Sequence, residues 1–187
     1  SLLGSCATRP PSAKSRTIPA SLGPVQLDPG SASRARICEN GFVQRLIATT
    51  TYKPTPESEA RAQGVAERCG LTWAPRTDSV TRLIRGQGAE GAYVVGPGRA
   101  ELRDLERRRI AVHAGTYPLV AKFGREHPLV RAVAPLDEPP PARVIDATLG
   151  LAKDAIHLAG ILGCEVVGLE RVRLLVCLAE DGLARLA

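Results

Sequence analysis

The last quarter of the chain passes from an apolar run to a turn of small residues, then to a helical repeat and a second apolar run. The first run, Val144 and Ile145, is β-branched and typical of a buried strand, which is predicted over residues 143–145. Between residues 151 and 162 the apolar positions recur at helical spacing, which predicts an amphipathic helix that ends at Gly163. Residues 165–169 predict a second strand. This strand–helix–strand order predicts that the two strands are parallel neighbours in one sheet.

The middle of the chain shows a second alternation of the same kind. The predicted strands are residues 43–51, 71–74 and 92–95, and the predicted helices run from Pro56 to about Cys69 and from Asp78 or Ser79 to about Gly86. Thr55 is placed to cap the first helix, with Pro56 at its first position and Gly70 at its end. Together these elements predict a small β-α-β-α-β unit.

Each strand of the C-terminal unit ends in an acidic residue, Asp146 in one case and Glu170 in the other. A right-handed crossover brings both strand ends to one edge of a parallel sheet, where ligands of doubly wound folds bind. A carboxylate in the position of Glu170 can accept two hydrogen bonds from a ribose diol. The small residues of the turn at 147–150 let a ligand approach the backbone.

The turn lacks the glycines of a dinucleotide fingerprint, because Thr148 and Ala152, two residues to either side of Gly150, leave no G-x-G pair in either register. An adenosine ligand without a diphosphate fits better, and S-adenosylmethionine (SAM) is the ligand of this kind that the pattern favours. Its ammonium group needs an acid near the turn, a role open to Asp146 or Asp154. From the residues alone, an ordinary strand–helix–strand unit with capping acids stays open as an alternative.

The segment DATLGLAKDAIHLAGILGCEVVGLER, residues 146–171, resembles the first motifs of class I methyltransferases. More narrowly, it is similar to the small-subunit ribosomal RNA methyltransferase J family, with its D-A-T-x-G-L-x-x-D-A, L-A-x-x-G-C-x-V and L-E-R runs. The tail at residues 176–185 resembles a helix of the same family. The likeness is strong from residue 122 onward, weaker between residues 47 and 115, and absent before residue 45.

Lys153 and Ala152 depart from the family pattern, which has arginine and glycine at these positions. The resemblance implies an α/β fold, the N-terminal part of a Rossmann-like class I methyltransferase core preceded by a small α/β subdomain. The implied divisions are a flexible basic leader at residues 1–41, the subdomain at residues 42–115, and the start of the SAM-binding domain at residues 116–187. The family's catalytic Asp-Pro turn is expected beyond residue 187.

The function implied by the resemblance is that of an enzyme, a SAM-dependent methyltransferase acting on a guanine exocyclic amine of small-subunit rRNA in the cytoplasm. Two alternatives stay open: a methyltransferase for a protein or small molecule, and a noncatalytic module that binds an adenosine ligand. The predicted cofactor site comprises Asp146, Thr148, Gly150, Lys153, Asp154, Glu170 and Arg171. Strand-end geometry independently supports Asp146, Gly150 and Glu170. The roles of Lys153, Asp154 and Arg171 rest on the resemblance alone.

Charge and composition add further expectations. With 25 basic and 19 acidic residues the net charge is +6, which favours an anionic partner such as RNA. No apolar run reaches the roughly 18 residues that a membrane-spanning helix requires, and no signal peptide is recognised. The five cysteines form no C-x-x-C pair and no metal-ligand spacing with histidine, which favours reduced thiols that pack as small hydrophobes and predicts no metal site. The sequence does not predict an oligomeric state.

Two further groups of polar residues and one histidine could each have more than one role. The hydroxyls and lysine of the loop at residues 49–53 suit either a phosphate or capping and turn formation, of which the second is favoured. The arginines at 103 and 107–109 suit either a solvated hairpin or a face for RNA. His157, on the predicted C-terminal helix, is expected to be a packing or surface residue and not a catalyst.

Overall fold

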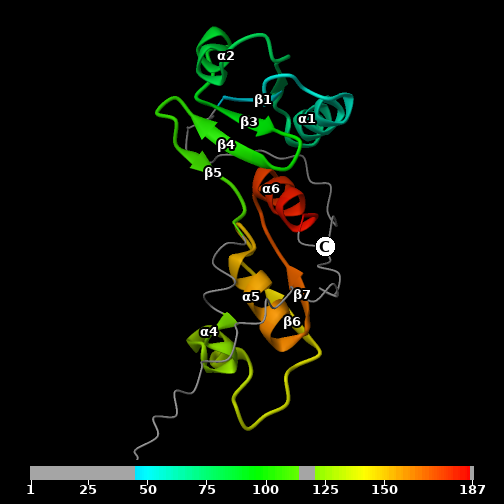
Figure 1. Cartoon of the computed structure of the whole chain (residues 1–187), viewed down its shortest axis with the longest axis vertical. Helices are drawn as coiled ribbons and strands as arrows, with labels where there is room; N and C mark the ends of the chain where they lie inside the picture. Colours follow the sequence, from blue (N-terminus) through cyan, green and yellow to red (C-terminus); the bar gives the residue numbers. More distant parts are fainter. Residues whose placement is uncertain (1–44, 114–120, 186–187) are drawn as a thin grey trace, which may run out of the picture.

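The structure, a computed structural model, describes residues 45–113 and 121–185, and these residues form two β-sheets. A five-stranded sheet has the order β2-β1-β3-β4-β5, and a two-stranded sheet pairs β6 with β7. Figure 1 shows the two sheets at different levels of the long axis, with helix α6 (Arg173–Leu183) between them. This architecture confirms the predicted α/β fold class.

The five-stranded sheet contains the predicted β-α-β-α-β unit. Its strands are β1 (Leu46–Thr50), β2 (Thr72–Trp73), β3 (Gly91–Val95), β4 (Ala100–Asp104) and β5 (Arg109–Ile110). β1 pairs in parallel with both β2 and β3. β4 and β5 extend the sheet as an antiparallel hairpin, which is the form expected for the arginine-rich segment around residues 103–109.

Local capping signals set the ends of the two helices in this unit. Helix α1 (Pro56–Cys69) begins with a capping box, in which the Thr55 side chain accepts a hydrogen bond from a backbone N–H of the first turn. It ends where Gly70 takes the left-handed conformation with φ of 66°. Helix α2 (Val80–Gly86) begins after Ser79, whose side chain caps it in a similar way. Both helices match their predicted bounds.

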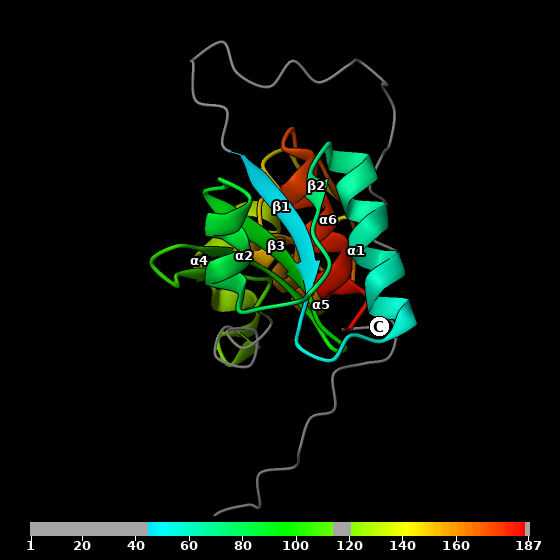
Figure 2. The same cartoon turned by 90° about the horizontal axis from the view of Figure 1, so that it is seen from above.

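Successive residues of β3 face two separate layers, as the two-residue period of a strand requires. Ala92 and Val94 pack with Ile84 of α2 in one apolar cluster. Tyr93 and Val95 belong to a larger cluster on the other face. Figure 2 shows α1 and α2 on opposite sides of β1 and β3. Because both faces are covered, all the residues of β3 are buried.

The second sheet confirms the predicted parallel pair in the C-terminal unit. Strands β6 (Arg143–Asp146) and β7 (Glu165–Gly168) are parallel neighbours, and α5 (Lys153–Leu162) connects them. The helix begins two residues after the predicted start. Gly150 and Ala152 have positive φ values of 51° and 57°, so the chain completes a turn before the helix can begin.

One apolar cluster of the described residues joins the two sheets. It includes Val65 of α1, Tyr93 of β3, Leu158 of α5, Val166 of β7 and Leu178 of α6. The short helices η2 (Gly124–Glu126) and α4 (Pro128–Val133) lie against α5. Helix α6 is therefore the element through which the C-terminal unit contacts the first sheet.

Two carboxylates on α6 reach the first unit through contacts of different kinds. Asp181 pairs with Arg61 of α1 and also accepts the backbone N–H of Ala100 at 2.6 Å. Glu180 pairs with Arg68 at 2.9 Å, and these two side chains are 37% and 55% exposed. Asp181 is only 10% exposed as a side chain. The two contacts therefore differ in how much solvent screens them.

Replacing Asp181 with alanine is expected to lower the free energy of unfolding by about 1–3 kcal/mol, because it leaves the N–H of the buried residue Ala100 without its acceptor. The neighbouring change Glu180→Ala removes a solvated pair and is expected to cost about 0–1 kcal/mol. Urea denaturation of the two variants measures the difference. Equal losses would show that the contact of Asp181 does not anchor α6.

The predicted uses of Thr49 and Thr50 are wrong. Both side chains are fully buried in the central region of the first sheet, and neither hydroxyl has a hydrogen-bond partner among the described residues. They cannot meet a phosphate, and they cap no helix. In the ladder, Thr49 and Thr50 pair with β3 alone, since β2 reaches only Ile47 and Ala48, and the polarity of their hydroxyls did not reveal that this end of β1 is buried.

Several expectations fall outside the described residues. They concern the flexible basic leader and the divisions at residues 41 and 115, so the predicted domain bounds stay predictions. Among the described residues, no helix has the length and apolarity to cross a membrane.

Candidate functional site

The candidate site lies at the carboxyl ends of β6 and β7, where two loops contact each other. The Leu169 N–H donates to the carbonyl of Asp146 at 2.8 Å, and the Leu149 N–H donates to the carbonyl of Leu169 at 3.0 Å. The loop after β6 thus continues the ladder of the sheet for one more step. The strand-end prediction placed Asp146 and Glu170 at the same edge, and the structure brings their two loops together there.

Glu170 ties the two loops to each other through its carboxylate. One oxygen, Oε2, accepts the backbone N–H of Gly150 at 3.0 Å, and Oε1 accepts the N–H of Val172 at 2.8 Å. The first bond crosses from the loop after β7 to the loop after β6. The second lies immediately before α6. A carboxylate offers about four acceptor positions, so two are left for a ligand.

Asp146 organises the turn that follows β6. Its Oδ1 accepts the N–H of Thr148 at 3.0 Å, which is the side-chain-to-backbone bond typical of an Asx turn. Thr148 is exposed, whereas Gly150 is half-buried and takes the left-handed conformation with φ of 51°. A side chain at Gly150 would be strained by this backbone conformation although the space around it is open.

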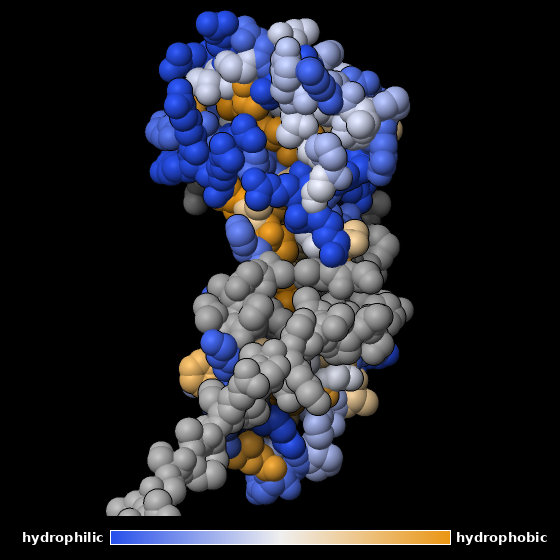
Figure 3. Space-filling view, viewed as in Figure 1, coloured by the Kyte–Doolittle hydropathy of each residue, from blue (hydrophilic) through white to orange (hydrophobic). Residues whose placement is uncertain are grey.

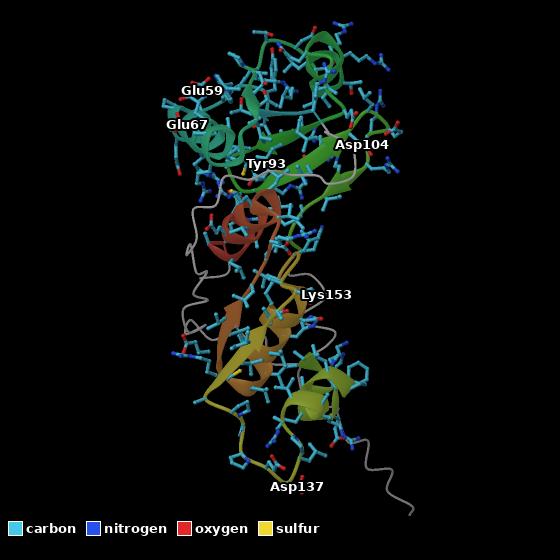
Figure 4. All side chains as sticks on the ribbon, turned by 180° about the vertical axis from the view of Figure 1, so that it is seen from behind. Glu59, Glu67, Tyr93, Asp104, Asp137 and Lys153 are labelled. Atoms are coloured by element: carbon cyan, nitrogen blue, oxygen red, sulfur yellow. The ribbon has the colours of Figure 1, made fainter. Side chains whose placement is uncertain are left out.

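The rim of the site is formed by charged residues on the first turn of α5 and on the loop before α6. Lys153 and Asp154 are exposed, and Figure 4 shows Lys153 at the N-terminal end of α5. Arg171 is also exposed. Ala152 takes the N-cap position with φ of 57° and gives the helix no side-chain cap. This left-handed residue occupies the position where the resembling family has glycine, which adopts such a conformation without strain.

Two residues that position the site were not predicted. A Cβ on Gly168 would lie 2.6 Å from Cδ1 of Leu149, so the absence of a side chain on β7 lets the turn pack directly against the strand. Val172 supplies the N–H that holds Glu170. A glycine inside a strand run is a signal of close approach, whereas nothing in the sequence marks the backbone of Val172.

His157 lies on α5 and is 2% exposed. Its ring centroid is 6.2 Å from that of His127. Burial lowers the pKa of His157 below its ordinary value, with a smaller opposing effect from Asp154. Of the two positions predicted for His157, packing or surface, the structure shows the packed one.

Acidification from pH 7.5 to 5.5 is expected to destabilise the chain, and His157→Gln is expected to reduce this loss. A histidine with a lowered pKa binds fewer protons in the folded state than in the unfolded state, so its stabilising effect is lost as the pH falls through the unfolded value of 6.5. Urea denaturation at several pH values measures the slope. An unchanged slope in the variant would contradict the assignment.

The described residues hold no cluster of three or more His, Cys, Asp or Glu side chains that could bind a metal ion. The groups that the site presents are carboxylates, basic side chains and backbone N–H and C=O groups. Asp146, Asp154 and Glu170 supply acceptors, while Lys153 and Arg171 supply positive charge at the rim.

Comparison with known proteins points to one group. Residues 109–187 match the family described as "Putative SAM-dependent methyltransferase". The chain is also similar to curated proteins named ribosomal RNA small subunit methyltransferase J. It is 38% identical to that of Haemophilus ducreyi over 111 residues, which covers 56% of this chain and 43% of the relative. It is 34% identical to that of Aeromonas hydrophila over 139 residues, covering 71% of this chain and 50% of the relative.

These matches place the similarity over both units, and the chain spans half the length of these relatives or less. A solved structure supports the fold. The crystal structure of a SAM-dependent methyltransferase from Neisseria gonorrhoeae superposes with a TM-score of 0.50 and 20% identity, covering 75% of this chain and 52% of that one. The resemblance found in the sequence and the predicted Rossmann-like fold are both confirmed.

Proposed function

We propose that the intact protein transfers a methyl group from SAM to small-subunit ribosomal RNA, because residues 109–187 match the family described as "Putative SAM-dependent methyltransferase". The observation that carries this proposal is that the family match covers the loops joined by Glu170. The relatives named as methyltransferase J support the RNA substrate. The methylated atom proposed is a guanine exocyclic amine, as the resemblance implies, and the place of action is the cytoplasm.

The residues at the strand ends fit the cofactor. Glu170 accepts hydrogen bonds from the backbone N–H groups of Gly150 and Val172 at two of its acceptor positions, and it can offer the remaining two to the ribose hydroxyls. Gly150 presents backbone without a side chain. Asp146 or Asp154 would meet the ammonium group of the cofactor.

The remaining residues of the proposed site shape its walls and rim. Thr148 lines the turn beside Gly150, and Lys153 and Arg171 stand at the exposed edge. When bound, SAM supplies an already activated methyl donor. The residues of this chain therefore contribute binding and orientation, which is the main way that enzymes accelerate such a transfer.

An RNA substrate also suits the charge of the chain, which is +6. On the β4–β5 hairpin, Arg103 and Arg108 pair with acidic neighbours, whereas Arg107 and Arg109 have no ion pair among the described residues. Figure 3 shows hydrophilic side chains over α2 and the β4–β5 hairpin. Contacts of this kind with phosphates weaken as salt rises, so RNA binding by the intact protein should be sensitive to salt.

The test is a transfer assay with the intact protein, methyl-labelled SAM and small-subunit rRNA that has not been modified. The proposal predicts label in the RNA, recovered on a guanine amine after digestion to nucleosides. Glu170→Gln should lower the transfer, while Glu165→Gln, an equal charge change at the first residue of β7, should not. Label found in protein or in small molecules instead would favour the alternative substrates. Cofactor binding without any transfer would favour the noncatalytic module.

A further inference from the structure

Two cysteines from the two units meet where α1 and α6 contact each other. Cys69 is the last residue of α1, Cys177 lies within α6, and their sulfur atoms are 3.5 Å apart although 108 positions separate them in sequence. The contact is a hydrogen bond between thiols. Figure 4 shows Tyr93 between the first sheet and α6, and its hydroxyl donates to the Cys177 carbonyl at 3.3 Å.

The surroundings of the pair favour reaction at sulfur. The hydrogen bond with Cys69 lowers the pKa of Cys177, and the nearby Arg68 guanidinium lowers it further, while burial opposes both. The same hydrogen bond raises the pKa of Cys69. Thiolate character therefore concentrates on Cys177, and the thiolate is the form that reacts with oxidants.

An oxidant of small size has a route to this thiolate. Cys177 is only 4% exposed, but it lines a cavity of about 590 Å³ together with Arg68 and Tyr93. Cys69 is half-buried and lies at the end of a helix, beside Gly70. The end of a helix adjusts more readily than its middle, so the two sulfur atoms can approach to the roughly 2 Å of a disulfide.

We propose that Cys69 and Cys177 form an oxidation site at which hydrogen peroxide converts the thiol pair into a disulfide that joins α1 to α6. In the first step the Cys177 thiolate attacks one oxygen of hydrogen peroxide, an S–O bond forms, the O–O bond breaks, and the other oxygen leaves as water after taking a proton. In the second step the Cys69 sulfur attacks the sulfur of the Cys177 sulfenic acid, the S–S bond forms, the S–O bond breaks, and the hydroxyl leaves as water with the Cys69 proton. The two sulfur atoms lose two electrons and the peroxide gains them.

The third cysteine of the described residues provides the contrast. Cys164 is buried, and burial raises the pKa of its thiol. Its sulfur contacts the carbonyl of Leu158 at 3.8 Å and no other thiol. The geometry therefore directs oxidation to the Cys69–Cys177 pair. This inference does not depend on the proposed methyl transfer, because the pair lies apart from the strand ends that carry Glu170.

Peptide mapping tests the proposal on the full chain, with Cys6→Ser and Cys38→Ser so that three of the five cysteines are left. Hydrogen peroxide is added, unreacted thiols are blocked in denaturant, and the protein is digested with trypsin without reduction. The expected product links residues 69–76 to residues 174–185 and disappears on reduction. Recovery of both peptides as blocked thiols, or as sulfinic acids, would overturn the proposal.

Two single-cysteine substitutions test the role assigned to each thiol. Cys69→Ser should remove the linked peptide and leave a sulfenic acid on Cys177 that a dimedone reagent traps, because the resolving thiol is missing. Cys164→Ser should leave the linked peptide unchanged. A linked product that contains Cys164 in the parent chain, or a sulfenic acid that fails to form in Cys69→Ser, would contradict the assigned roles.

Discussion

Glu170→Gln is expected to weaken binding of S-adenosylhomocysteine to the intact protein by roughly ten- to a hundredfold, because charge-assisted hydrogen bonds each contribute about 1.5–3 kcal/mol. Both carboxylate oxygens of Glu170 already accept backbone N–H groups, from Gly150 and Val172. Glutamine keeps one acceptor oxygen and turns an NH₂ group toward the other N–H. The change therefore disturbs the loop contact and also removes an acceptor for the ribose. Calorimetric titration measures the affinity.

Glu165→Gln is the matched control for this prediction. Glu165 lies at the first position of β7 and pairs with Arg143 at 2.7 Å, at the opposite end of the strand from the proposed site. The substitution changes the net charge equally, so a general electrostatic effect would appear in both variants. Affinities that fall together would remove the specific role of Glu170.

Leu178→Ala is expected to lower the free energy of unfolding of the chain by about 2–5 kcal/mol, the range seen for buried leucines. Leu178 is 1% exposed and belongs to the cluster that contains residues of both sheets. The cavity left behind would loosen α6 against the first sheet and against the C-terminal unit together. Urea denaturation followed by circular dichroism measures the loss.

Leu136→Ala is the control for the same chemical change at an exposed position, since Leu136 is 45% exposed. It is expected to change the free energy of unfolding by about 0.5 kcal/mol or less. A small loss in Leu178→Ala, similar to that of the control, would show that the apolar cluster does not join the two sheets in solution.

The elements defined by local signals were predictable from the sequence. Thr55, Pro56 and Gly70 determine the ends of α1 through bonds made within a few residues of each other. The strands on either side of α5 followed from apolar runs and a helical repeat, although the prediction that the first of them is buried was wrong, since Ile145 of β6 is 64% exposed. Their parallel pairing followed from the handedness of such connections, which does not depend on the rest of the chain.

The features that depend on distant contacts were not predictable. Thr49 and Thr50 are polar, yet both are fully buried at the end of β1, where only β3 pairs with them. Cys69 and Cys177 come together because α6 packs on α1, and no spacing in the sequence indicates that contact. At the candidate site the acids were identified from their strand ends, whereas the roles of Gly168 and Val172 depend on the packing and hydrogen bonding of the loops.

The loops joined by Glu170 are proposed to hold the adenosine part of SAM, and a crystal structure of the intact protein with S-adenosylhomocysteine is the decisive measurement. Both ribose hydroxyls are expected within hydrogen-bond distance of the Glu170 carboxylate, with the ligand lying against the backbone at Gly150. A ligand bound elsewhere, with Glu170 contacting only Gly150 and Val172, would show that these loops do not bind the cofactor.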